Sequence, residues 1–264
     1  MKTGLCSVTF RGLDVPQVAQ LASQAGLQAI EWGGDIHVPP GDERRASFAR
    51  DTCDERGLKC PSYGSYFVLG ETDERQIAPT LATAKALGAD VIRVWAGPKG
   101  KGSTAYNDDD FERLAQATRR FAQAAGDSGL VVATEFHRGR FADNSDAVLK
   151  LIDRVRHPAL RTYWQWECAI PVGQAKAQIA ALRPHIAHLH VFNWTADGTR
   201  LPLSDARSDW LALLSELGEG KDGMTAYLEF IPQDDQDQLD EETKTLAAIA
   251  MSSSDQYALR NQQK

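Results

Sequence analysis

Four segments of the chain end in side chains that can bind a metal ion. Residues 131–134 form a mostly β-branched run that leads directly into Glu135, and three later apolar segments end in the same manner. The four side chains at these ends are Glu135, Gln165, His190 and Glu229. Continuous apolar runs of this length are typical of buried parallel strands, and functional residues gather where such strands end.

These four side chains offer three oxygen ligands and one nitrogen ligand. That combination suits a hard or borderline divalent ion, so we expect one Mn²⁺ or Mg²⁺ ion per chain, with Zn²⁺, Co²⁺ or Fe²⁺ as alternatives. The other interpretation is that the four are buried polar residues that pair with cationic side chains of the interior. Among the strand ends, Arg93 is the cation placed for such pairing.

The rest of the chain alternates strand and helix from end to end. The predicted strands span residues 5–10, 28–32, 59–63, 91–95, 130–136, 161–166, 187–192 and 225–230. The predicted helices span residues 15–25, 43–56, 74–87, 109–125, 145–155, 173–182, 205–217 and 238–250. Because each helix returns the chain to the same end, eight such units predict eight parallel strands that close into a single α/β domain, a (β/α)8 TIM barrel. We expect the barrel to span residues 1–251, followed by a polar tail at residues 252–264.

A doubly wound open sheet is the alternative fold. Such a sheet usually carries a glycine-rich phosphate loop after an early strand. Residues 9–12, with the sequence Thr-Phe-Arg-Gly, do not form one. The barrel is therefore the favoured architecture.

Composition limits the partners of the protein. The chain has 264 residues and a net charge of −7. This excess of negative charge argues against nucleic acid or an anionic membrane surface as the main partner, and no apolar run approaches the roughly 18 residues of a membrane span. The cysteines lack CxxC spacing, which predicts reduced thiols in a cytoplasmic protein. These cysteines are Cys6, Cys53, Cys60 and Cys168. We expect a small-molecule partner, and the sequence leaves open whether the chain forms a homo-oligomer.

Other side chains near the strand ends predict contacts to a carbohydrate substrate. Aromatic faces suit the C–H surfaces of a sugar ring, and an arginine can bind a hydroxyl, carboxylate or phosphate group. The candidates are His37, Tyr63, Arg93, Trp95, His137, Trp194 and Arg200. The alternative is that half of the aromatic residues pack the barrel and that His37 lies in a surface loop. Residues 195–204, after the seventh predicted strand, are long enough to form a lid.

Five short motifs together resemble one protein family. They are Ala29-Ile30-Glu31-Trp32-Gly33-Gly34-Asp35, Leu87-Gly88-Ala89, Glu135, His188-Leu189-His190 and Leu228-Glu229-Phe230. In their order and spacing they resemble the xylose-isomerase-like TIM barrels, also called the sugar phosphate isomerase/epimerase family. The resemblance covers nearly the whole chain. It implies a single divalent metal ion bound by Glu135, His190 and Glu229, with a fourth ligand from the sixth strand.

The chain departs from the family pattern at this sixth strand. The family usually has Asp where this chain has Gln165, and a histidine often stands where this chain has Cys168. Glutamine can bind a metal through its carbonyl oxygen, but the site then has one negative charge fewer. Alternation along a strand puts Gln165 and Glu167 on the same face. We favour Gln165, because Glu167 is expected to lie beyond the barrel rim.

The resemblance implies an enzyme of carbohydrate metabolism, a metal-dependent sugar or keto-sugar isomerase or epimerase. In this role Glu135 and Glu229 would act as acid and base on a carbon next to a carbonyl group. One alternative is a metal-dependent lyase or dehydratase that acts on a cyclic polyol or keto-glycoside and begins with the same proton abstraction. Another is a non-catalytic sugar-binding barrel, since Gln165 weakens the metal site. The DNA-repair endonuclease branch needs more histidines and a basic face, and this acidic chain argues against it.

Overall fold

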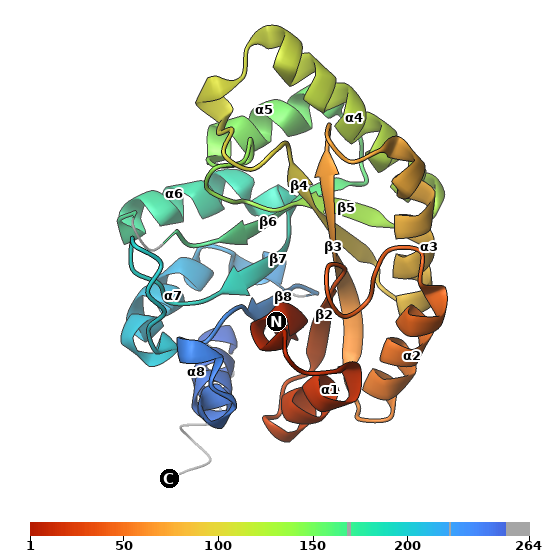
Figure 1. The fold of residues 1–264 in the computed structure, drawn as a ribbon. Coiled ribbons are helices and arrows are strands. Elements are labelled where there is room, and N and C mark those ends of the chain that lie inside the picture. Colours follow the sequence, from red (N-terminus) through yellow and green to blue (C-terminus); the bar gives the residue numbers. More distant parts are fainter. Residues whose placement is uncertain (168–169, 222, 252–264) are drawn as a thin grey trace.

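Eight parallel strands form a closed barrel in the computed structural model, which describes residues 1–167, 170–221 and 223–251 (Figure 1). Each strand pairs with the next, and β8 closes the barrel by pairing with β1. The strands are β1 Lys2–Cys6, β2 Ala29–Gly33, β3 Lys59–Leu69, β4 Val91–Ala96, β5 Val131–Thr134, β6 Leu160–Gln165, β7 Ile186–Val191 and β8 Thr225–Leu228. The predicted single (β/α)8 barrel is confirmed. Cys168 and the polar tail predicted at residues 252–264 lie outside the described residues.

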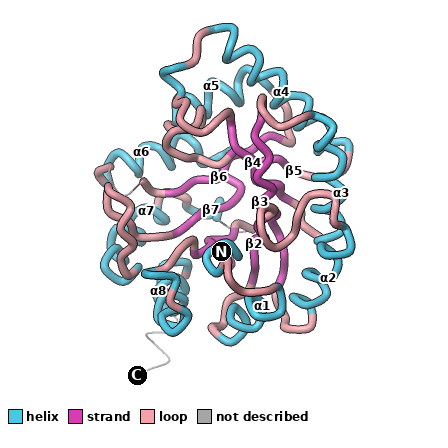
Figure 2. The backbone as a smooth tube through the Cα atoms, viewed as in Figure 1, coloured by secondary structure: helices cyan, strands magenta, loops and turns pink. Residues whose placement is uncertain are grey.

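An α-helix follows each strand and lies on the outside of the barrel (Figure 2). The helices are α1 Val15–Gln24, α2 Glu43–Asp54, α3 Ile77–Leu87, α4 Asp108–Asp127, α5 Ser145–Val155, α6 Val172–Leu182, α7 Arg207–Ser215 and α8 Leu239–Ala250. Local sequence signals mark the ends of these helices. Asp14 and Gln17 form a capping box at the start of α1, with both side-chain-to-backbone bonds at 2.9 Å. In the described part of the chain, no helix combines the length and the apolar character that a membrane span requires.

The first strand differs from its prediction. It spans Lys2–Cys6 rather than residues 5–10, and Ser7–Phe10 form a 3₁₀ turn. The hydroxyl of Ser7 accepts the backbone N–H of Gly33 at 2.9 Å, and the hydroxyl of Thr9 accepts that of Phe230 at 3.0 Å. These bonds hold the turn against the end of β2 and the segment that follows β8, so its residues are buried outside the sheet. The first strand therefore ends at Cys6.

The third strand also differs from its prediction, because it continues to Leu69 instead of ending at Tyr63. Its pairing with β4 shifts register between Gly64 and Val68. Within this irregular stretch Tyr66 has a φ of 60°, in the left-handed region that non-glycine residues rarely occupy.

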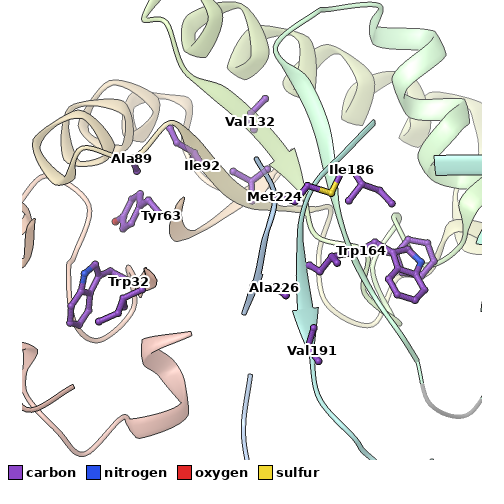
Figure 3. Packing of buried hydrophobic residues seen from close by; sticks show 14 of the residues in the cluster. Trp32, Tyr63, Ala89, Ile92, Val132, Trp164, Ile186, Val191, Met224 and Ala226 are labelled. Atoms are coloured by element: carbon purple, nitrogen blue, oxygen red, sulfur yellow. The ribbon is translucent and has the colours of Figure 1, made fainter. Parts of the chain in front are cut away.

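Apolar side chains fill two layers. The larger layer lies between the strands and the helices, and it includes Trp32, Ile92, Trp164 and Ile186 (Figure 3). A smaller group packs inside the barrel and includes Cys6, Ala29, Ala133, Tyr163 and Tyr227. A Cβ atom at Gly4 would lie 2.6 Å from the Tyr227 ring, so glycine there makes room for this inner group. The barrel interior is therefore a packed core that supports the C-terminal ends of the strands.

Candidate metal centre and active site

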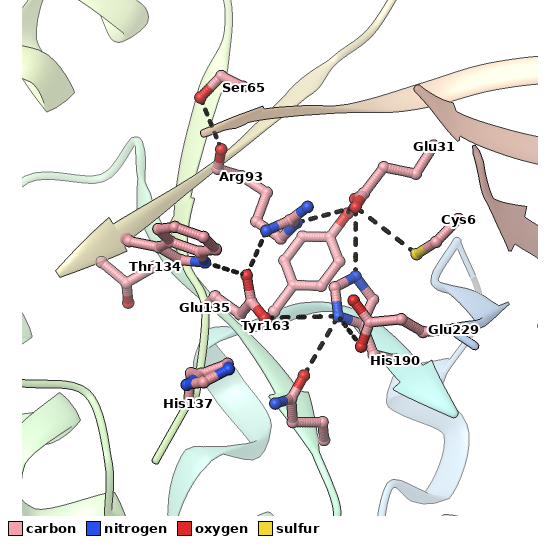
Figure 4. Close-up of polar contacts among 12 residues, drawn as sticks. Cys6, Glu31, Ser65, Arg93, Thr134, Glu135, His137, Tyr163, His190 and Glu229 are labelled. Carbon is pink, nitrogen blue, oxygen red and sulfur yellow. Dashed lines mark hydrogen bonds and ion pairs between the residues drawn. The ribbon is translucent and has the colours of Figure 1, made fainter. Parts of the chain in front are cut away.

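The four predicted metal ligands meet at the C-terminal end of the barrel. Glu135 and Glu229 directly follow β5 and β8, Gln165 ends β6, and His190 lies in β7. The Nδ1 atom of His190 is 3.2 Å from Gln165 Oε1, 3.3 Å from Glu229 Oε2 and 3.9 Å from Glu135 Oε1 (Figure 4). All four side chains are buried, and Glu229 is the most exposed at 7%. Three oxygen donors therefore surround one imidazole nitrogen.

The opposite edge of the His190 ring faces Glu31. The distance from His190 Nε2 to Glu31 Oε1 is 3.3 Å. The same oxygen accepts hydrogen bonds from Arg93 Nε at 2.8 Å and from the Cys6 thiol at 3.7 Å. The other oxygen, Oε2, accepts from Tyr163 at 2.6 Å and from Ser62 at 2.9 Å. Both oxygens of the buried Glu31 carboxylate are therefore fully hydrogen-bonded within the protein.

Arg93 connects Glu31 to Glu135. Its Nε atom donates to Glu31, and its Nη1 atom donates to Glu135 Oε2. Trp95 Nε1 donates to the same Glu135 oxygen at 2.5 Å. Glu135 Oε2 is thus held by two donors, while Oε1 faces His190. The sequence left open that the predicted ligands pair with a buried cation instead of a metal ion. Arg93 does pair with Glu135, and the four predicted ligands nevertheless lie together around His190.

The predicted ligands and the side chains that support the site come mostly from different halves of the barrel. The predicted ligands follow or belong to β5–β8. The side chains that hold Glu31 and Glu135 come mostly from β1–β4, namely Cys6, Ser62, Arg93 and Trp95, with Tyr163 of β6 added. The supporting side chains therefore come mostly from the first half of the barrel, and the predicted ligands come from the second half.

Electrostatics keep the two carboxylates bonded to Arg93 ionised. Burial opposes ionisation of Glu31, but Arg93 and His190 hold its pKa well below the ordinary value. Burial also opposes ionisation of Glu135, and the same two cationic partners lower its pKa. Burial raises the pKa of the Cys6 thiol to about 12, so this thiol remains a donor at neutral pH.

The residues present fit a divalent cation. Glu135, His190 and Glu229 each offer a ligand atom, and these atoms lie within 4.8 Å of one another. A histidine that binds a cation must be neutral, and with a neutral His190 the buried carboxylates of Glu31, Glu135 and Glu229 and the single guanidinium of Arg93 leave two negative charges. Uncompensated buried charge is costly, and a divalent ion would balance it. A second ion between Cys6, Glu31 and His190 fits less well, because Arg93 already bonds to Glu31 there.

Glu167, the alternative ligand, lies beyond the end of β6 and bonds to Arg138. Its carboxylate accepts the backbone N–H of Arg138 at 3.1 Å and lies 3.8 Å from the Arg138 guanidinium. Gln165 instead contacts His190 directly. The geometry favours Gln165 as the fourth donor.

Two of the predicted substrate contacts do not reach the site. His37 is 1% exposed, and its ring nitrogens lie 2.9 Å from the Ser7 hydroxyl and 3.0 Å from the Leu13 carbonyl oxygen. Tyr63 is fully buried, and its hydroxyl donates to the Val38 carbonyl oxygen at 2.8 Å. Because their polar atoms are already bonded within the scaffold, we do not propose either residue as a substrate contact. Arg93 is likewise committed to two carboxylates and 2% exposed, so it is better placed to hold Glu135 than a substrate.

The other four predicted contacts lie at the edge of the site. Trp95 is half-buried beneath the Arg140 guanidinium, which lies 3.9 Å from its ring centre, and its ring lies 6.4 Å from that of His137. Nδ1 of His137 lies 2.6 Å from the carbonyl oxygen of Arg138, so Nδ1 carries a hydrogen and donates it to this oxygen.

Arg200 belongs to the segment predicted as a lid, and Trp194 directly precedes that segment. They form an isolated antiparallel bridge with each other. Trp194 stacks on Phe192 at 4.3 Å, and Arg200 lies over the Phe230 ring and pairs with Asp234. The segment after β7 is therefore joined to the segment after β8.

Sequence reasoning missed the residues that support the predicted ligands. Glu31 stands in one of the five motifs without a predicted role, and Cys6, Ser62 and Tyr163 are not among the predicted site residues. One signal was available for Glu31, since a carboxylate within a fully buried strand must find cationic or donor partners. Its partners could not be found this way, because His190 is 159 residues away in the chain.

Comparison with known proteins places the chain in a family. Residues 19–251 match the xylose isomerase-like TIM barrel family. The chain belongs to this family. It is 24% identical over 207 residues to a 3-dehydroshikimate dehydratase of Bacillus anthracis, a match that covers 73% of this chain and 72% of that protein. The resemblance inferred from the five motifs is therefore confirmed.

Solved structures share the fold at low sequence identity. The crystal structure of a probable 3-dehydroshikimate dehydratase of Bacillus anthracis has a TM-score of 0.80 and 19% identity, covering 94% of this chain and 99% of that chain. A 3-keto-D-glucoside 4-epimerase of E. coli has a TM-score of 0.72 and 17% identity, covering 94% and 98%. The proteins similar to this chain thus include a dehydratase and a sugar epimerase.

Proposed function

We propose that the protein is a divalent-metal-dependent enzyme that removes a proton from the carbon next to the carbonyl group of a small sugar or keto-sugar, and that it acts as an isomerase or epimerase. The observation that carries this proposal is the convergence of two glutamates, a glutamine and a histidine at the C-terminal end of the barrel. Active sites of TIM-barrel enzymes lie at this end. The epimerase among the similar structures supports the same reaction class.

The metal ion would be held by Glu135, Gln165, His190 and Glu229. When bound, it would polarise the substrate carbonyl and stabilise the negative charge that develops on its oxygen. The oxygen-rich donor set favours Mn²⁺ or Mg²⁺, with Zn²⁺, Co²⁺ or Fe²⁺ as alternatives.

The two glutamates are not equivalent as proton acceptors. Glu135 Oε2 already accepts from Arg93 and Trp95, which lowers its basicity. The Glu229 carboxylate contacts His190 and has no other hydrogen bond to a described residue. We therefore assign proton abstraction mainly to Glu229, while Glu135 serves as a ligand and as the weaker base, which can act as the acid on the other face. His137, Trp95, Trp194 and Arg200 are the proposed substrate contacts.

A dehydratase or lyase is the second candidate. It is favoured by the 24% identity to a 3-dehydroshikimate dehydratase. The first step would be the same, because removal of the proton next to a carbonyl also precedes loss of a β-hydroxyl group. The two candidates differ only in whether a proton returns to the carbon or a leaving group departs.

Product analysis in D₂O tests the proposal and separates the candidates. The purified protein, loaded with Mn²⁺ or Mg²⁺, is incubated with a panel of keto-sugars and dehydroshikimate-like cyclic ketones, and the products are analysed by NMR and mass spectrometry. An isomerase or epimerase retains the molecular formula and incorporates solvent deuterium next to the carbonyl. Loss of water indicates the dehydratase. Turnover that is unaffected when both Glu135 and Glu229 are changed to Gln would exclude this chemistry.

A further inference from the structure

Glu31 lies behind the proposed metal centre rather than in it. Its Oε1 atom is 3.3 Å from Nε2 of His190, while Nδ1 on the opposite edge of the same ring faces the three oxygen donors. Glu31 is 1% exposed and His190 is fully buried, so water does not compete for this contact. The ring therefore lies between a supporting carboxylate and the proposed ligands.

We infer that Glu31 is a positioning residue that fixes both the tautomer and the orientation of His190. A carboxylate accepts a hydrogen bond and cannot donate one, so it requires the His190 proton on Nε2. The Nδ1 lone pair is then free to face Gln165, Glu229 and Glu135. Histidines that bind metals usually donate their other N–H to a carboxylate or carbonyl in this way, which also makes the nitrogen that binds the metal more basic.

Glu31 can hold this position because it is itself held from both sides. Tyr163 and Ser62 fix Oε2, and Arg93 fixes Oε1. Gly64 makes room for this arrangement, since a Cβ atom there would lie 2.6 Å from Arg93 Nη2 and 3.1 Å from Glu31 Oε1. Through Arg93 the same carboxylate is linked to Glu135, so one buried residue supports two of the proposed ligands.

The inference rests on the proposed metal centre, and its test measures the metal directly. Mn²⁺ affinity is determined by titration for the wild-type protein and for Glu31→Gln, which keeps the shape of the side chain but offers a weaker acceptor. We expect Glu31→Gln to lower the affinity about 10–100-fold. Glu242→Gln is the matched control, because Glu242 is also a buried glutamate but bonds to the backbone N–H of Leu203, away from the site. Its affinity should stay within about twofold of wild type.

A second variant separates position from charge. Glu31→Asp keeps the negative charge but shortens the side chain by one methylene group, so its carboxylate is withdrawn from His190. The affinity should fall in this variant as well. Wild-type affinity in Glu31→Asp, together with a loss in Glu31→Gln, would show that only the charge matters and would overturn the positioning role.

A measurement on the wild-type protein covers the case in which the Glu31 variants do not fold. Long-range ¹H–¹⁵N spectra of the Zn²⁺-loaded protein distinguish a protonated ring nitrogen from a metal-bound one, and His190→Gln identifies the His190 signals. We expect Nε2 of His190 to be protonated and Nδ1 to bind the metal. The reverse assignment would overturn the inference. If the wild-type protein binds no divalent ion at all, the proposed function and this inference both fail, whereas unchanged affinity in Glu31→Gln refutes the inference alone.

Discussion

Arg93 holds one oxygen of Glu135 and leaves the other facing His190. Its Nη1 atom donates to Glu135 Oε2, and the pair is buried, with each side chain 3% exposed. A buried ion pair is strongly destabilised when one partner is removed, because the other charge is left uncompensated. The role of Glu135 in binding the metal therefore cannot be separated from its role as the partner of Arg93.

This relationship predicts different outcomes for the two glutamates. Glu229→Gln should retain most of the metal affinity but reduce kcat by about 10²–10⁴-fold, the usual contribution of a general base. Glu135→Gln should lose metal affinity and thermal stability together, because Arg93 loses its anionic partner. Metal titration, thermal unfolding and the rate of deuterium exchange into substrate would be measured for both variants. Identical behaviour of the two would contradict the proposed division of roles.

The contact between Gln165 and His190 predicts that the charge at position 165 affects the metal affinity. Gln165→Asp adds a negative charge next to His190, so we expect metal binding that is as tight as in wild type or tighter. Gln165→Leu removes the oxygen donor and should weaken binding. Calorimetric titration with Mn²⁺ would compare the three forms, with Glu167→Gln as the control because Glu167 faces Arg138. Equal affinity in all three forms, with a loss in the control, would move the fourth ligand to Glu167.

Gly64 predicts a steric effect on the Arg93 network. In Gly64→Ala the new methyl group would lie 2.6 Å from Arg93 Nη2, so the guanidinium must move. We expect a loss of about 1–3 kcal/mol of unfolding free energy, as is typical of overpacking, together with weaker metal binding. Gly12→Ala is the control, since no atom lies within 4 Å of a Cβ atom placed there. Denaturant unfolding measures the stability, and an unaltered Gly64→Ala protein would mean that the network tolerates displacement.

His37 predicts a dependence of stability on pH. The Leu13 carbonyl oxygen must accept from Nε2, so Nδ1 of the neutral ring accepts from Ser7. Burial lowers the pKa of His37 below its ordinary value of 6.5. As the pH falls below about 6.5, the unfolded chain takes up a proton that the folded state resists, so stability is lost at up to about 1.4 kcal/mol per pH unit.

The corresponding measurement compares unfolding temperatures between about pH 7.5 and pH 5. His37→Gln should be less stable than wild type near neutral pH, because the bonds to Ser7 and Leu13 are altered. Its unfolding temperature should nevertheless fall less steeply on acidification. Parallel pH profiles of the two proteins would remove His37 from the acid sensitivity.

The sequence predicted the barrel and the convergence of Glu135, Gln165, His190 and Glu229 for a simple reason. Parallel strands all end at the same side of a barrel, so residues at their ends meet whatever their separation in the chain. The end of β1 was not predicted, because the sequence of Ser7–Phe10 gives no sign that Ser7 and Thr9 bond to residues far away in the chain. The role of Cys6 was not predicted either, because its thiol bonds to Glu31, which is 25 residues away in the chain.

The hydrogen-bonding partners of individual side chains were harder to predict. A polar residue after a strand can face the substrate or satisfy a loop, and the choice depends on contacts between distant segments. His37 bonds to Ser7 and Leu13, and Tyr63 bonds to Val38, whereas Glu31 reaches Tyr163 across 132 residues. No local pattern encodes such partners, because each requires the closed barrel.

The pairing of β1 with β8 also has a consequence for folding during synthesis on the ribosome. Lys2–Cys6 bonds on one side to β2 and on the other to β8, which is synthesised after the other seven strands. Until Thr225–Leu228 emerges, one edge of β1 lacks its hydrogen-bonding partner, and exposed strand edges recruit other chains. The shortness of β1, with glycine at its centre, limits this hazard during translation. Glu229 is synthesised directly after β8, the strand that covers this edge of β1. The nascent chain therefore gains the last of the proposed metal ligands when the edge is closed.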